Sequence, residues 1–282
     1  MKSGTLYIVA TPIGNLEDIT FRAVRILKEA DLVAAEDTRH SRKLLSHYGI
    51  SRPLTSYFDH NKTVKGGFIL DRLKAGESVA LISDAGTPCI SDPGYELVRD
   101  ALAEGIPVVP IPGPSAAIAA LSAAGLPTDS FTFAGFLPNR PGKRREKLAG
   151  LAGEERVLLY YESPRRLLAT LADIHAVCGD REVVVVRELT KVYEEFVRGK
   201  VSAVEERLRD REIKGEVVLL VAPAVPAAKG ERADVVGLLR HFMADDGLSL
   251  KDAVARVAGE TGTPRRSVYE EALRLKECLA ER

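Results

Sequence analysis

Residues 81–94 of the chain, LISDAGTPCISDPG, end an apolar run with a dense group of turn-forming residues. The apolar run VALI at 79–82 is typical of a short buried strand. The stretch contains two Gly, two Pro and two Asp, and no Lys, Arg or His. Because ligands of open α/β sheets bind beyond the carboxyl ends of the strands, this stretch predicts a ligand-binding loop.

Two other apolar runs end in loops of the same kind. TPIGN at 11–15 follows the run at 5–10, and PGPSAA at 112–117 follows the run at 107–111. Glycine in each loop lets backbone N–H groups approach a ligand closely. One such loop is ordinary turn chemistry, but three at one edge of a sheet predict a cofactor pocket.

The order of the apolar runs predicts two α/β domains. In residues 1–127, short runs alternate with helical periodicity, which is typical of a parallel sheet with crossover helices. GLPTD at 125–129 interrupts this order, and residues 128–223 contain strands with fewer crossovers, which predicts a mixed sheet. We predict a linker at 224–231 and then a helical tail at 232–282, which is either a helix-turn-helix element or a tail packed on the body.

Charge and cysteine content restrict the class of protein. The 40 basic residues balance the 40 acidic ones, so no overall field favours nucleic acid or membrane. Cys89, Cys178 and Cys278 are far apart and form no CxxC pair, which favours a reducing compartment and argues against structural zinc. No apolar run is long enough to span a bilayer, so we expect a soluble cytoplasmic protein.

The predicted pocket lacks the common nucleotide-binding motifs. The dinucleotide fingerprint G-x-G-x-x-G is absent after the first strand, and RPGKRR at 140–145 is only an incomplete phosphate-binding loop. The three loops contain hardly any Lys or Arg, which a pyrophosphate or triphosphate would usually require. An uncharged or cationic ligand, recognised by backbone groups and small side chains, is favoured.

Several strings carry a resemblance to a known family. They are LYIVATPIGNLEDIT (6–20), EDTR (36–39), LISDAGTPCISDPG (81–94), PIPGPSAAIAAL (110–121), FAGFLP (133–138) and YYESPRR (160–166). Together they resemble the bacterial family of ribosomal RNA small subunit 2′-O-methyltransferases of type I, over about residues 5–223. The resemblance implies two α/β domains of the tetrapyrrole methylase type, with the cofactor cleft between them. It also implies S-adenosylmethionine as methyl donor, a cytidine 2′-hydroxyl in the decoding centre of 16S rRNA as acceptor, and a homodimer.

The resemblance also implies which loop residues contact the donor. They are Ile13 and Gly14 in the first loop, Gly86, Thr87, Pro88 and Ile90 in the second, and Ser115 and Ala116 in the third. The wider fold often has Asp where this chain has Thr87. Whether Thr87 or Asp84 meets the amino group of the donor therefore stays open.

Methyl transfer to a ribose hydroxyl needs in-line positioning and an acceptor for the hydroxyl proton, and neither task needs a metal. The histidines have no spacing suited to a metal site. The candidate proton acceptors are carboxylates at or near strand ends, and each has helix capping as its structural alternative. These candidates are Glu36, Asp37, Asp84 and Glu162, with Asp92 as a weaker one.

Local clusters of positive charge predict the surface that holds the RNA. Residues 37–65 contain six Lys or Arg against two Asp, and residues 136–166 contain eight against four Glu. Phosphate contacts fix the position of a protein on RNA, and Lys and Arg supply most of them. From these segments we predict RNA contacts by Arg39, Arg42, Lys43, Lys143, Arg144, Arg145, Arg165 and Arg166, with 16S rRNA or the 30S subunit as partner.

Two other functions stay open at this point. One is methylation of a porphyrin-like small molecule by the same fold, against which the basic segments argue. The other is non-catalytic binding to RNA or the ribosome, which the helix-turn-helix pattern of the tail would suit.

Overall fold

The computed structural model describes residues 4–58, 62–224, 235–245, 247–261 and 265–280. The chain forms two compact units, Met1–Ala224 and Val225–Arg282. Each unit is described by itself. In the described part of the chain, no helix is both long and apolar enough to cross a membrane.

The first half of the larger unit is a parallel five-stranded sheet in the order β3-β2-β4-β1-β5. All four strand pairings are parallel, which confirms the predicted sheet. Its strands are β1 (Leu6–Val9), β2 (Leu32–Ala35), β3 (Leu54–Ser56), β4 (Val79–Ile82) and β5 (Val108–Ile111). The intervening elements are the 3₁₀ turn η1 (Leu16–Asp18) and helices α1 (Phe21–Glu29), α2 (Thr38–His47), α3 (Lys62–Lys74), α4 (Tyr95–Ala103) and α5 (Ala116–Ala124).

Local sequence explains where these elements begin and which face they bury. Helix α1 begins after Thr20, whose Oγ1 accepts a hydrogen bond from the Ala23 N–H at 3.1 Å. Its apolar residues at helical spacing, Ala23, Ile26 and Leu27, are buried against the sheet. Strands β2 and β4 are buried at every position, as expected for central parallel strands covered on both faces. Because β4, β1 and β5 are adjacent and parallel, the loops that follow them meet at one edge of the sheet.

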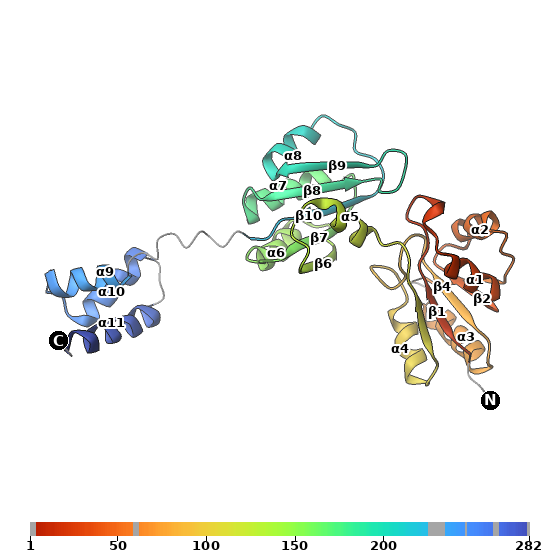
Figure 1. The fold of residues 1–282 in the computed structure, drawn as a ribbon, viewed down its shortest axis with the longest axis horizontal. Helices are drawn as coiled ribbons and strands as arrows, with labels where there is room; N and C mark the ends of the chain where they lie inside the picture. Colours follow the sequence, from red (N-terminus) through yellow and green to blue (C-terminus); the bar gives the residue numbers. More distant parts are fainter. Residues whose placement is uncertain (1–3, 59–61, 225–234, 246, 262–264, 281–282) are drawn as a thin grey trace. The chain divides into compact units, whose positions relative to one another are not determined.

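The second half is a mixed sheet in the order β6-β7-β10-β8-β9 (Figure 1). Only β6 and β7 are parallel, and the other pairings are antiparallel, which confirms the prediction of a mixed sheet. The strands are β6 (Phe131–Phe136), β7 (Val157–Glu162), β8 (Glu182–Arg187), β9 (Glu195–Lys200) and β10 (Val217–Val221). The helices are α6 (Pro141–Leu151), α7 (Leu167–Cys178) and α8 (Val201–Leu208).

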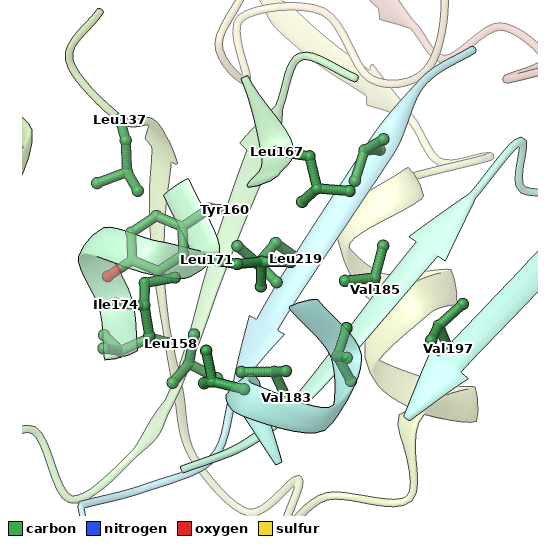
Figure 2. Close-up of a cluster of buried hydrophobic side chains, with 14 of the residues drawn as sticks. Leu137, Leu158, Tyr160, Leu167, Leu171, Ile174, Val183, Val185, Val197 and Leu219 are labelled. Atoms are coloured by element: carbon green, nitrogen blue, oxygen red, sulfur yellow. The ribbon is translucent and has the colours of Figure 1, made fainter. Parts of the chain in front are cut away.

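The core of the second half lies on the α6, α7 and α8 side of its sheet (Figure 2). Alternate residues of β7, Leu158 and Tyr160, point into it, and they meet Leu171 and Ile174 of α7. The intervening residues of the strand, such as Leu159, point to the opposite face and pack against α5. Each strand thus contributes to two apolar layers.

Helix α5 follows the first series of strands but packs on the second sheet. Its Ala120 and Leu121 join the core that includes Val184 and Leu220. Arg198 of β9 donates to the carbonyl groups of Ala123 and Ala124 at the carboxyl end of this helix. The predicted domain limit near residue 127 stays a prediction. The chain passes from one sheet to the other at the loop that precedes α5.

The smaller unit contains α9 (Val235–Arg240), a π-helical turn η2 (His241–Asp245), α10 (Leu250–Thr261) and α11 (Arg265–Ala280). Its helices share an apolar core that includes Leu239, Val257 and Val268. Ser249 caps the start of α10, because its Oγ accepts a hydrogen bond from the Asp252 N–H at 3.3 Å. Most of the predicted linker, and residues 262–264 between α10 and α11, lie outside the described residues.

Candidate active site

A cavity of about 490 Å³ lies where the loops of the first sheet meet the strands of the second. We call it the first cavity. Loops after β1, β2, β4 and β5 form one side, and β6, β7, β8 and β10 with their adjoining loops form the other. Its lining consists of Ile13, Glu36, Asp84, Ala85, Gly86, Thr87, Ile90, Ser91, Asp92, Ser115, Ala116, Phe136, Tyr161, Glu162, Ser163, Pro164, Val186, Leu189, Gly215, Glu216, Val217 and Val218.

Backbone hydrogen bonds hold the first two glycine-containing loops together. Thr11 and Gly86 exchange N–H···O hydrogen bonds of 2.9 and 3.0 Å. Gly86 has φ of +80°, and a Cβ there would lie 3.3 Å from Cγ2 of Ile13. A side chain at this position would therefore meet both backbone strain and a close contact.

The structure brings most of the predicted donor-contacting residues to the first cavity. Thr87 lines it, but its hydroxyl donates to the carbonyl of Pro114 at 3.1 Å, so the side chain ties the second loop to the third. Gly14 lines a neighbouring cavity instead, and Pro88 lines neither. The predicted residues in the lining are Ile13, Gly86, Thr87, Ile90, Ser115 and Ala116.

The loop between β4 and α4 holds two non-glycine residues in the left-handed region. Cys89 has φ of 70° and Ser91 has φ of 67°. Such conformations cost energy and persist where the surrounding structure imposes them, often next to functional sites. Asp92 follows this strained segment and lines the first cavity. Asp92 is not the N-cap of α4, because Gly94 occupies that position, two residues after Asp92.

The charge of the lining is one-sided. Glu36, Asp84, Asp92, Glu162 and Glu216 line the first cavity, and no Lys, Arg or His is among its described lining residues. Apolar side chains of the second sheet, such as Val186 and Val218, supply the rest of the wall. A cavity with this lining favours a cationic ligand with an apolar part and disfavours a phosphate.

Glu162 is fully committed within the protein. Its carboxylate accepts from the Ser163 N–H and from Thr170 Oγ1, each at 2.7 Å, and it forms an ion pair with Arg166 at 2.5 Å. The side chain of Glu162 has no exposed surface. These partners fix Glu162 as a structural anion at the end of β7.

Asp37 also serves the local structure. Its Oδ1 accepts from the Arg39 N–H at 2.8 Å, which makes it the N-cap of α2, and this bond lowers the pKa of the Asp37 carboxyl. Asp37 does not line the first cavity. Its own N–H donates to Oδ1 of Asp84 at 3.0 Å, which orients the Asp84 carboxylate in the lining.

Asp92 has an altered proton affinity. Burial raises the pKa of its carboxyl, and the neighbouring charge of Asp84 raises it further, while a hydrogen bond from the Ser83 side chain opposes both effects. The two carboxylates lie near each other in the same lining. The first cavity therefore contains one carboxyl, that of Asp92, whose protonated form is favoured by its surroundings.

A second cavity of about 350 Å³ adjoins the first. Ile13, Asp84, Ala85 and Glu216 line both, and we call these four residues the shared wall. The second cavity has basic side chains on its outer wall, from α2 and from the loop after β8. Its lining consists of Pro12, Ile13, Gly14, Leu16, His40, Lys43, Leu44, Asp84, Ala85, Lys191 and Glu216.

The loop at residues 188–191 was not predicted from the sequence, and its Lys191 lines the second cavity. Nζ of Lys191 contacts Glu188 at 2.8 Å and Glu216 at 3.1 Å. Burial opposes the protonated form of Lys191, but hydrogen bonds to Glu188 and Glu216 raise its pKa above the usual value. The Asn15 N–H donates to Thr190 Oγ1 at 3.1 Å, and a Cβ at Gly14 would clash with Lys191.

The residues predicted to contact RNA divide into exposed and internal groups. Arg39, Arg42, Lys43, Lys143 and Arg165 are exposed, although Arg39 also contacts Asp37. Arg145 is mostly exposed, and it reaches Asp173 at 3.4 Å.

Two of the predicted RNA contacts need correction. Arg144 is only 4% exposed and is bound to Asp173 at 2.6 Å, so its guanidinium joins α6 to α7 inside the protein. Arg166 is engaged by buried Glu162. Neither guanidinium is free for phosphate.

Comparison with known proteins identifies close relatives over nearly the whole chain. Residues 5–205 match the family model of tetrapyrrole (corrin/porphyrin) methylases, and residues 230–276 match a C-terminal helix-turn-helix domain named after RsmI. The ribosomal RNA small subunit methyltransferase I of Halalkalibacterium halodurans is 49% identical, over 94% of this chain and 93% of its own. The protein of the same name from Pseudomonas aeruginosa is 48% identical, over 97% of this chain and 98% of its own.

Solved structures share the fold at low sequence identity. The cobalt precorrin-4 methyltransferase CbiF has a TM-score of 0.61 at 22% identity, and the match covers 77% of this chain and 94% of that one. Uroporphyrin-III C-methyltransferase of Thermus thermophilus, complexed with S-adenosylhomocysteine, has a TM-score of 0.56 at 21% identity, covering 79% and 99%. The chain is a methyltransferase that belongs to the tetrapyrrole (corrin/porphyrin) methylase family and, within it, to the ribosomal RNA small subunit methyltransferase I proteins.

Proposed function

We propose that the protein transfers a methyl group from S-adenosylmethionine to the 2′-hydroxyl of a cytidine in the decoding centre of 16S rRNA. The acidic lining of the first cavity carries the proposal, because no cation is among its described lining residues. Glu162 and Glu216 are paired with Arg166 and Lys191, so the negative charge offered to a ligand comes mainly from Glu36, Asp84 and Asp92. The names of relatives 49% and 48% identical support small-subunit rRNA as substrate. We also propose that the enzyme acts in the cytoplasm as a homodimer.

The residues of the first cavity suit this donor. When bound, S-adenosylmethionine supplies a methyl group activated by a positively charged sulfonium. Backbone and small side chains at Gly86, Ser115 and Ala116 would hold it, together with Ile13, Thr87 and Ile90. The carboxylates would favour its positive charges, and Val186, Leu189 and Val218 would cover its apolar parts.

Asp84 is the best placed proton acceptor. It belongs to the shared wall, so it lines both the first and the second cavity. The Asp37 N–H fixes one of its oxygens, whereas Glu162 is occupied by three partners. Asp84 would accept the proton of the weakly acidic ribose hydroxyl as the new bond to carbon forms. Asp92 lies beside it and adds negative charge to the donor side.

The overall reaction is tested with labelled donor and alternative acceptors. Wild-type protein is incubated with S-adenosylmethionine labelled in the methyl group and with undermethylated 30S subunits, free 16S rRNA or a tetrapyrrole precursor. We expect label in the RNA at one nucleotide, in a linkage that resists alkaline hydrolysis because the 2′-hydroxyl is blocked. Label in the tetrapyrrole, or in none of the acceptors, would contradict the proposal.

The role of Asp84 is tested with Asp84→Asn, which keeps an oxygen for the Asp37 N–H. Loss of a general base typically costs about 10²–10⁴-fold in rate. We expect kcat to fall in that range while the donor still binds in calorimetry. Asp129→Asn is the control, because Asp129 is exposed and lines neither cavity. A wild-type kcat for Asp84→Asn would remove Asp84 from the mechanism.

A further inference from the structure

The two adjoining cavities differ in charge. The described lining of the first contains only acidic charged residues, whereas the second has His40, Lys43 and Lys191 beside Asp84 and Glu216. Such an arrangement would direct a cationic ligand into the first cavity and a negatively charged ligand into the second. We propose that the second cavity binds the acceptor nucleotide as unpaired RNA, with Lys43 and His40 of α2 contacting its flanking phosphate. This inference rests on the proposed function and assigns its acceptor site.

The basic wall follows directly from helical spacing. His40, Lys43 and Leu44 stand at i, i+3 and i+4, so they share one face of α2, and that face lines the second cavity. Asp37 caps the same helix and bonds to Asp84, which sets the position of α2 relative to the shared wall. Leu44 and Leu16 add apolar surface beside Lys43 and His40.

The cations of this cavity are not equally available. Lys191 is bound to Glu188 and Glu216, so its charge is already balanced. Lys43 and His40 are exposed, and within the described part of the chain neither forms an ion pair or a side-chain hydrogen bond. A phosphate can therefore bind Lys43 without breaking an existing ion pair, which it could not do at Lys191.

The size and walls of the cavity restrict the form of the RNA. About 350 Å³, bounded by α2 on one side and the 188–191 loop on another, suits one nucleotide and not a base-paired stem. The tight contact between Gly14 and Lys191 keeps that loop against the loop after β1. The acceptor base must leave its stack to enter, as in other enzymes that modify a nucleotide within RNA or DNA. Its ribose then reaches Asp84 from the side opposite the donor.

The test separates RNA binding from donor binding. Lys43→Gln and His40→Gln are compared with Lys28→Gln, whose lysine is exposed on α1 and lines neither cavity. Binding of a fluorescein-labelled, single-stranded cytidine-containing ribo-oligonucleotide is followed by anisotropy over a range of salt concentrations. S-adenosylmethionine binding is measured by calorimetry, and KM is measured for undermethylated 30S subunits.

We expect Lys43→Gln to weaken oligonucleotide binding about tenfold at low salt and to reduce the slope of log K against log salt by about 0.7, the value for one phosphate contact on a single strand. KM for the 30S subunit should rise, and the donor Kd should equal that of wild type. His40→Gln should have a smaller effect in the same direction. Lys28→Gln should match wild type throughout.

The outcomes that overturn the inference differ from those that overturn the proposed function. If Lys43→Gln and His40→Gln keep wild-type RNA affinity and salt slope, or change only the donor Kd, the second cavity is not the acceptor site. If the wild type methylates none of the RNA acceptors but its RNA binding still depends on Lys43, the inferred site stands and the proposed reaction does not.

Discussion

The carboxyl group of Asp92 lies partly buried in the first cavity beside Asp84, and this environment raises its pKa. At pH values below the unfolded-state pKa of this group, Asp92 is protonated in both the folded and the unfolded chain. Burial of its carboxyl as a charge therefore does not lower the folding stability in that pH range. As the pH rises, the unfolded chain loses the proton first, and stability falls until the folded-state pKa is passed. Keeping Asp92 ionised at neutral pH thus costs folding free energy.

We therefore expect Asp92→Asn to stabilise the protein at pH 7, by on the order of 1 kcal/mol for each unit by which the pKa is raised. The gain should disappear as the pH approaches 3. The same substitution should weaken S-adenosylmethionine binding, because it removes a negative charge from the donor side. Thermal melting between pH 3 and pH 8, combined with calorimetry of the donor, checks both effects. A destabilised variant with unchanged donor affinity would contradict the assigned role of Asp92.

At the scale of helices and strands, the ion pair between Arg144 and Asp173 joins α6 to α7 in the second half of the larger unit. Removing one member of a buried ion pair leaves the other charge without compensation. We expect Asp173→Asn to lower the free energy of unfolding by about 3 kcal/mol. Arg145→Gln is the matched control, because this exposed arginine reaches the same carboxylate only at 3.4 Å. It should lower the free energy of unfolding by less than about 1 kcal/mol.

Guanidinium unfolding midpoints measure both variants. Equal effects of Asp173→Asn and Arg145→Gln would show that the internal pair contributes no more than the surface one. Methyl transfer should persist in Asp173→Asn at temperatures where it stays folded, because Asp173 lines neither the first nor the second cavity.

At the level of loops and helices, the sequence predicted the loops on the first side of the cavity and Glu162 on the second, but not the 188–191 loop. The loops after β1, β4 and β5 carry Gly and Pro after clear apolar runs, and parallel topology brings them together. The 188–191 loop has no such mark, because its left-handed residues, Glu188 and Thr190, are not glycine. Its place beside Gly14 depends on contacts between distant parts of the chain.

The basic segments show a second limit of prediction. The run KRR at 143–145 shows how much positive charge is present, but it does not show which side chain points into the protein. The helical spacing indicates which one does, because Arg144 lies four residues before Leu148 and both lie on the buried face of α6. Without the position of Asp173 on α7, however, an internal arginine is the less expected interpretation.

The molecule as a whole consists of two units with separate cores, and the lining of both cavities lies between Pro12 and Val218 in the larger one. We expect a chain ending at Ala224 to fold and to bind S-adenosylmethionine within about twofold of the full-length Kd. Circular dichroism melting and calorimetry provide the measurement. A truncated chain that melts cooperatively but no longer binds the donor would show that the smaller unit contributes to the donor site.

The shared wall also has a consequence for inhibitor design. Ile13, Asp84, Ala85 and Glu216 line both cavities, so the two lie side by side, and a single compound that joins an adenosyl amino acid to a nucleotide is a candidate ligand for both. Once one half is bound, the other binds at a high effective concentration, which can raise affinity by about 10²–10⁴-fold over either half alone. The cationic part of such a compound belongs among the carboxylates and its phosphate beside Lys43. A compound with this polarity would discriminate against enzymes of the same fold that lack a basic residue at that position.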